Sequence, residues 1–296
     1  MTVTLLPTHD REALLTWYAA NRRRSRQLFD LVAPEAYTAQ PIPLRHPIVF
    51  YEGHLPAFSF ITLVRGSLAG KALDDSLERL FQRGIDPADA RTAQRAQPAS
   101  WPPRERIREA AQRWDEAVLE ALRNEPLERI TPAAYTLLEH EQMHHETLLF
   151  MLHRLPTGEL RKPQGYEPRM DGARPVRHRV KIPAGRVTLG AARDELDFGW
   201  DNEFEACREK VAEFSIDAHS VTNDDYLAFV EHGGEPPPFW VRRGHHWALR
   251  ALFEVIPLPL AWPVYVSRDQ AVAYAAWKGA RLPTEAEFHR AAYGTP

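Results

Sequence analysis

Three histidines in the first half of the chain have the residue type and spacing needed to bind a metal ion. His140 and His144 lie four residues apart in a segment with a helical pattern of apolar residues. Side chains at this spacing differ by about 40° around a helix axis, so both imidazoles project from one face and can share an ion. Neutral imidazole suits zinc, iron, copper or nickel. The pair alone is a weak indicator, because unrelated surface or core histidines can have the same spacing.

His54 is the candidate for a third ligand from another helix. It lies in a mostly apolar segment, Tyr51–Phe58, in which an unpaired imidazole would be costly to bury. The alternative is a core histidine bonded to a backbone carbonyl. His46 is a weaker candidate, because Arg45-His46-Pro47 is typical of the end of a loop.

The residues after the histidine pair face other directions. His145 and Glu146 lie about 100° and 200° further around the helix than His144, so neither can bind the same ion without distortion. We expect Glu146 to act from outside the ligand set, either by orienting a ligand imidazole or by contacting a neighbouring helix.

Composition restricts the class of protein. Hydrophobic residues make up 44% and charged residues 26% of the 296 positions, and the net charge of −3 gives no electrostatic reason to bind nucleic acid or an anionic membrane. The basic run Arg22–Arg26 fits intramolecular ion pairs or a solvated face better than a binding patch. The single cysteine, Cys207, excludes an intrachain disulfide and a cysteine-based zinc site. Without a signal-peptide pattern or a long apolar stretch, we expect a soluble, cytoplasmic protein.

Four long amphipathic segments predict a four-helix bundle in the first half of the chain. They cover about residues 10–32, 48–68, 102–124 and 131–155, and a shorter helix is expected at 74–82. Pro56 should kink the second helix. Pro102-Pro103 and Thr131-Pro132 should open the third and the fourth, because proline is favoured in a first helical turn.

The pattern changes after Pro156. Residues 157–177 have little periodicity and are typical of a linker, whereas short strands are expected at 179–182, 186–189 and 211–216. Short helices are expected at 223–231 and 268–278, and a further one should start at Pro283-Thr284. The sequence therefore predicts an α+β protein with a helical domain at 1–156, a linker, and a mixed domain at 178–296.

The metal motif and the second half of the chain both resemble known families. His140-xxx-His144-x-Glu146, with Gly53-His54 upstream, resembles the signature of the DinB-like helical bundle. The second half is similar to the formylglycine-generating-enzyme or sulfatase-modifying-factor domain, a C-type-lectin-like fold, here ending before the domain is complete. The segments that carry this similarity are Ile182–Gly185, Phe198–Glu203, Val221–Phe229, Pro263–Ser267 and Ala273–Glu287. The pairing of the two domains resembles the nonheme-iron sulfoxide synthases of ergothioneine and ovothiol biosynthesis and the related selenoneine synthase.

The resemblance implies that His54, His140 and His144 bind Fe(II) and leave open positions for substrates and dioxygen. The implied reaction joins a sulfur or selenium donor oxidatively to the imidazole ring of hercynine (Nα-trimethylhistidine). Met143 stands where ergothioneine-type enzymes often have a glutamine that contacts this substrate. Trp240 is a candidate cation–π contact for a quaternary ammonium group, with core packing as the alternative.

The sequence does not determine which sulfur or selenium donor is used or which residue is the catalytic acid. Residues 44–58 and 83–87 look similar to the selenoneine-synthase branch, but cysteine, γ-glutamylcysteine or a thiosugar are alternative donors. Members of the family continue past the position that matches Pro296, so the catalytic acid and most substrate contacts are expected beyond it. A zinc- or nickel-dependent thiol transferase of the helical-bundle superfamily and a non-catalytic metal-binding fragment are the alternative functions.

Overall fold

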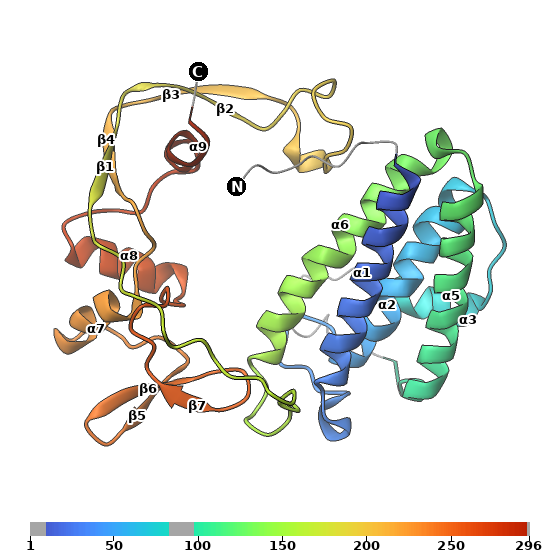
Figure 1. Ribbon diagram of the computed structural model, residues 1–296, viewed down its shortest axis with the longest axis horizontal. Coiled ribbons are helices and arrows are strands. Elements are labelled where there is room, and N and C mark those ends of the chain that lie inside the picture. Colours follow the sequence, from blue (N-terminus) through green and yellow to red (C-terminus); the bar gives the residue numbers. More distant parts are fainter. Residues whose placement is uncertain (1–9, 83–97, 295–296) are drawn as a thin grey trace. The chain divides into compact units, whose positions relative to one another are not determined.

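The computed structural model describes residues 10–82 and 98–294. The chain divides into two compact units, residues 1–164 and 165–296, and each is described by itself (Figure 1). The segment 83–87, which the sequence associates with the selenoneine-synthase branch, lies outside the described residues. Among the described residues, no helix has both the length and the apolar character that a membrane crossing requires.

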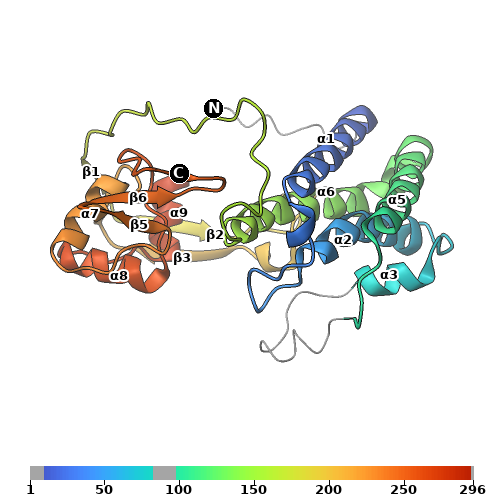
Figure 2. The same ribbon diagram turned by 90° about the horizontal axis from the view of Figure 1, so that it is seen from below.

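Unit 1 is a bundle of four long helices (Figures 1 and 2). They are α1 (Arg11–Asp30), α2 (Ile48–Phe60), α5 (Arg104–Asn124) and α6 (Leu127–Leu152). Helix α1 packs against α6 and α2 against α5, and the short α3 (Asp75–Phe81) covers α2. The structure thus confirms the helical bundle that the sequence predicts.

Helix α2 is the central element of unit 1. Nearly all of its residues are buried, which fits its apolar composition around the whole helix circumference. It runs through Pro56 and continues as a π-helical segment, Ile61–Ser67. On α5, Ile107, Trp114 and Val118 recur at helical spacing and are fully buried. His54, in the middle of α2, therefore lies in an almost dry environment.

Helix α6 begins earlier than the sequence predicts. Thr131-Pro132 were expected to open it, but its first turn starts at Leu127, directly after Pro126, and Pro132 lies inside the helix. A proline at this place removes one backbone hydrogen bond. Ile130 is fully buried in the extra turn, so apolar packing compensates for the missing bond.

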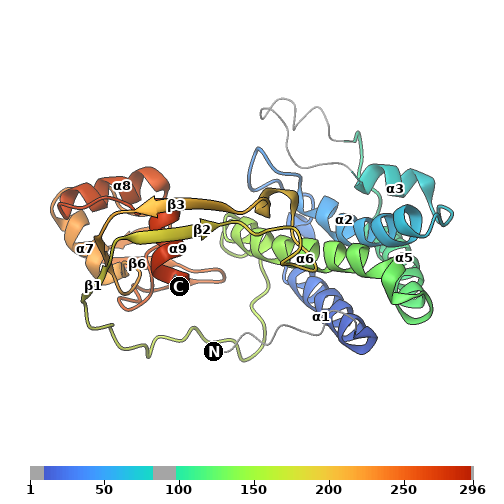
Figure 3. The same cartoon turned by 90° about the horizontal axis from the view of Figure 1, so that it is seen from above.

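Unit 2 combines small antiparallel sheets with short helices (Figure 3). Its strands are β1 (Arg179–Ile182) paired with β4 (Phe214–Asp217), β2 (Gly185–Leu189) paired with β3 (Cys207–Val211), and the sheet of β5 (Trp240–Arg243), β6 (His246–Arg250) and β7 (Val255–Pro257). Its helices are α7 (Asn223–Glu231), α8 (Arg268–Trp277) and α9 (Glu285–Tyr293). Helix α9 packs on β2 and β3, where Arg290 donates to the backbone carbonyls of Pro183 and Arg186.

Unit 2 differs from the prediction in its strands. The single strand expected at 211–216 is two strands, β3 and β4, which pair with different partners. Most of β3 is charged and exposed, so it has no alternating apolar pattern. The sheet β5–β7 was not predicted, and its first turn uses Gly244 in a positive-φ conformation, which short hairpin turns require. The three helices match their predicted positions, and α9 starts directly after Thr284, whose side chain caps it.

Helices α2 and α3 approach each other closely at Gly53. A Cβ atom on Gly53 would lie 2.4 Å from the ring of Phe81, which is fully buried at the end of α3. The ring therefore occupies the space that any other residue at position 53 would need.

Replacing Gly53 by alanine should lower the free energy of unfolding of unit 1. Alanine gains about 1 kcal/mol of helix preference over glycine, but overpacking a core costs about 1–3 kcal/mol, and the buried Phe81 ring already packs against Phe50 and Trp114. Denaturant unfolding followed by helical circular dichroism measures the change. The double variant Gly53→Ala/Phe81→Leu should be less destabilised than the sum of the single variants; additive losses would contradict this explanation.

Candidate metal centre

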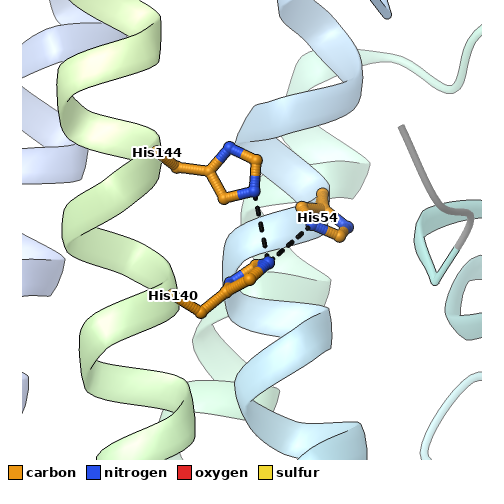
Figure 4. Close-up of side chains that lie close together, drawn as sticks. All are labelled: His54, His140 and His144. Carbon is orange, nitrogen blue, oxygen red and sulfur yellow. Dashed lines mark hydrogen bonds between the residues drawn. The ribbon is translucent and has the colours of Figure 1, made fainter. Parts of the chain in front are cut away.

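Two helices bring three histidines together inside unit 1. Helix α6 contributes His140 and His144, one turn apart, and α2 contributes His54 (Figure 4). The Nε2 atom of His140 lies 3.4 Å from Nε2 of His54 and 3.2 Å from Nε2 of His144. One ligand atom from each residue falls within 4.8 Å of the other two. The structure thus assembles the set of residues that the sequence singles out.

Two of the three nitrogen–nitrogen separations match those of ligands that share one metal ion. An imidazole nitrogen lies about 2.1 Å from a bound zinc ion, so two such ligands at tetrahedral or octahedral angles are about 3.0–3.4 Å apart. The two measured separations, 3.2 and 3.4 Å, agree with this range. Three protein ligands leave further coordination positions open, which is typical of catalytic metal sites.

Burial keeps the three imidazoles uncharged. Desolvation lowers the pKa of His54 to about 4, that of His140 to about 2 and that of His144 to about 3. The neighbouring imidazoles lower the last two further, because a charge on one ring disfavours a charge on the next. At neutral pH each ring is therefore in the form that binds a metal.

The ring of His54 is oriented by a hydrogen bond and by stacking. Its Nδ1–H donates to the backbone carbonyl of Phe81 at 2.6 Å. A carbonyl can only accept, so the proton is on Nδ1 and the lone pair of Nε2 faces the other histidines. The ring also stacks on Phe50, with centroids 4.9 Å apart.

His140 and His144 are held differently. The His140 ring stacks on Phe58, with centroids 3.6 Å apart and an interplanar angle of 13°. The ring of Tyr51 lies beside that of His144, with centroids 5.4 Å apart. The Nδ1 atoms of both histidines are buried and have no hydrogen-bond partner among the residues that the structure describes. Aromatic contacts and the helix itself therefore determine the directions of these two rings.

Glu141 and His145, each one position after a histidine of the pair, face α1 instead. Glu141 is 0% exposed, and its Oε1 accepts hydrogen bonds from the guanidinium of Arg22 and the hydroxyl of Ser25. Ser25 Oγ is also 2.8 Å from Nε2 of His145. Arg22 continues the network to Asp115 on α5, with Nε 2.8 Å from the carboxylate. The ion pairs of Arg22 agree with the intramolecular role expected for the basic run.

The sequence did not single out Glu141 or Ser25, and it gave no specific partner for Arg22. One signal was available: Glu141 and His145 repeat the four-residue spacing of the histidine pair, shifted by one position. Their partners could not be predicted, because the pairing of α1 with α6 depends on the tertiary arrangement.

The remaining candidates lie outside the cluster. Glu146 is exposed on α6, and Met143 is 45% exposed one residue before His144. Trp240 is 6% exposed and packs on Tyr226 in the core of unit 2. His46 is buried against Phe50.

Family models match both halves of the chain. Residues 18–148 match the DinB superfamily, and residues 166–296 match the sulfatase-modifying factor enzyme 1-like domain. The first range contains the three histidines, and the second contains all strands of unit 2.

Two relatives align with nearly the whole chain, and a third aligns with part of it. It is 30% identical to hercynine oxygenase of Mycobacterium tuberculosis over 307 residues, which cover 96% of this chain and 70% of that protein. It is 29% identical to ergothioneine biosynthesis protein 1 of Neurospora crassa over 340 residues, or 94% of this chain and 37% of that protein. Formylglycine-generating enzyme of Streptomyces coelicolor is 31% identical over 153 residues, which cover 41% of this chain and 48% of that enzyme. The chain spans only 37% of the length of the Neurospora crassa protein and 38% of that of ergothioneine biosynthesis protein 1 of Schizosaccharomyces pombe.

Replacing any one of the three histidines by alanine should reduce the affinity for a divalent ion by more than about 100-fold. Loss of a direct ligand should exceed the about 10- to 100-fold loss that follows when a residue contacting a ligand is changed. Anaerobic titration with Co²⁺, together with elemental analysis, measures affinity and stoichiometry. His245→Ala, at an exposed position of the β5–β6 turn, is the control and should bind one ion as the unmodified protein does. An alanine variant of His54, His140 or His144 with unchanged affinity would exclude that residue as a ligand.

Proposed function

The chain belongs to the sulfoxide synthase family of ergothioneine and ovothiol biosynthesis, and we propose that it catalyses iron(II)- and dioxygen-dependent bond formation between hercynine and a sulfur or selenium donor. The relatives' names supply the substrate class, hercynine, and the type of enzyme, an oxygenase. The observation in this chain that supports the proposal is the buried cluster of three neutral histidines.

The ligand set fits iron(II). All three donors are uncharged imidazole nitrogens, which suit a divalent ion of intermediate softness. A set of three leaves room for the substrates and dioxygen at one centre. When bound, the iron would supply the one-electron redox chemistry and oxygen activation that amino-acid side chains lack.

The balance of the reaction defines what the site must accommodate. For a thiol donor, the C–H bond of the hercynine ring and the S–H bond of the donor are broken, and a C–S bond forms. Dioxygen provides the sulfoxide oxygen, and its second atom leaves as water with the two hydrogens. Both organic substrates must therefore lie side by side, and holding them in this arrangement is itself a large contribution to the rate.

The residues of unit 1 provide orientation and exclusion of water. The stacked rings of Phe50 and Phe58 cover His54 and His140 and keep one side of the cluster apolar. Met143 projects about 60° from His140 on α6, on the side away from Glu141, and its side chain is exposed. We propose that the substrates approach over Met143, because its exposed side chain neighbours His140, which is less buried than His54 and His144.

Product analysis tests this function. Iron-loaded protein, hercynine and oxygen are incubated with cysteine, γ-glutamylcysteine and a thiosugar, and with their selenol counterparts, and products are identified by mass spectrometry. We expect a hercynine adduct with at least one donor, dependent on iron and oxygen and absent with His140→Ala. The donor that reacts fastest decides between the sulfur and selenium branches.

Two outcomes would contradict the proposal. Turnover of a thiol by zinc-loaded protein without oxygen would indicate a thiol transferase, in which the metal activates a thiolate. Tight iron binding without any product would indicate a metal-binding role only.

A further inference from the structure

Helix α6 carries two pairs of residues with the same spacing and different partners. His140 and His144 face α2, and Glu141 and His145, each one position later, face α1. A shift by one residue is a rotation of about 100° around the helix axis. The direction in which α6 presents its histidines is therefore coupled to the contacts of the second pair.

The contacts of the second pair are buried and converge on one hydroxyl. Ser25 is 1% exposed; its hydroxyl donates to Glu141 Oε1, and its oxygen lies 2.8 Å from His145 Nε2. Arg22 Nη1 donates to the same carboxylate oxygen at 2.6 Å. One turn earlier, Asn21 Nδ2 donates to the backbone carbonyl of Leu138 at 2.9 Å. Helix α1 thus holds α6 along consecutive turns.

The histidines on α6 lack the usual means of orientation. A ligand imidazole generally donates its second nitrogen to a carboxylate or carbonyl, as His54 does to Phe81. The Nδ1 atoms of His140 and His144 have no such partner in the part of the chain that the structure describes. The positions of the His140 and His144 rings therefore depend strongly on how α6 is rotated about its axis, because no hydrogen bond to Nδ1 fixes them independently.

A small rotation is enough to change the site. Side-chain atoms lie about 5–6 Å from a helix axis, so a rotation of about 10° moves them by about 1 Å. Metal–ligand distances tolerate changes of about 0.2 Å. The network between α1 and α6 therefore has to hold the helix to within a few degrees.

We propose that Ser25, Glu141 and His145 are positioning residues for the metal site: they fix the rotation of α6 and thereby aim His140 and His144 at His54. None of the three positioning residues contacts the ion. The inference rests on the proposed metal centre, and it adds Ser25 of α1 and Glu141 and His145 of α6, none of which is part of the family motif.

Ser25→Ala is the variant that tests the proposal. Replacing Glu141 would leave the Arg22 charge buried beside Asp115 alone, and such a protein can fail to fold. Ser25→Ala changes no charge and removes the hydroxyl that contacts both Glu141 and His145. Ser59→Ala is the matched control, because Ser59 is also 1% exposed in unit 1, and its hydroxyl donates to Leu55 within its own helix.

Cobalt binding supplies a readout that does not depend on activity. With Ser25→Ala we expect a Co²⁺ dissociation constant about 10- to 100-fold higher than that of the unmodified protein, and altered positions and intensities of the visible cobalt bands. Ser59→Ala should keep the spectrum and the affinity of the unmodified protein. Thermal melting of both variants controls for general destabilisation. His145→Phe keeps a ring but removes the bond to Ser25, and it should change the cobalt spectrum in the same way.

Three results would overturn the proposal. Unchanged cobalt affinity and spectrum in both Ser25→Ala and His145→Phe would show that the network does not position the ligands. An equal effect of Ser59→Ala would assign the change to loss of stability. Failure of the unmodified protein to bind Co²⁺ would refute the metal centre itself, and the function proposed above with it.

Discussion

The burial of three imidazoles in one small volume is the constraint on which this structure depends. A proton on any of them would be poorly solvated and would repel a charge on its neighbours, which is why the pKa values of His54, His140 and His144 fall to about 4, 2 and 3. The surroundings follow from this requirement. Helix α2 is apolar around its circumference, and glycine at position 53 lets Phe81 come close enough for its carbonyl to accept a hydrogen bond from His54 Nδ1–H.

A second requirement is that the buried carboxylate of Glu141 be paired with a positive charge within the bundle. Glu141 is next to a ligand in sequence, yet it is paired with Arg22 between α1 and α6. Removing one partner of a buried ion pair costs about 3–5 kcal/mol, a large part of the about 5–15 kcal/mol by which a domain is stable. The same helix therefore carries an uncharged face, which we propose binds the metal, and a charged face that attaches it to the bundle.

The sequence predicted those features that local patterns determine. Helical spacing gave the four long helices and placed His140 and His144 on one face, and the apolar segment around position 54 indicated the third histidine. The start of α6 was misplaced, because proline preference is local whereas the burial of Ile130 is tertiary. Strand β3 was missed because its charged residues show no alternation, and the partners of Glu141 could not be inferred without knowing that α1 packs on α6.

We propose that three imidazoles from α2 and α6 bind one catalytic iron. X-ray absorption spectroscopy of the iron(II)-loaded protein, prepared without oxygen, can test this binding. We expect three imidazole nitrogens at about 2.1 Å from the iron, with water oxygens in the remaining positions, and two imidazoles in the His54→Ala variant. Fewer than three imidazoles around the iron of the unmodified protein, or a number unchanged by His54→Ala, would contradict the proposed site.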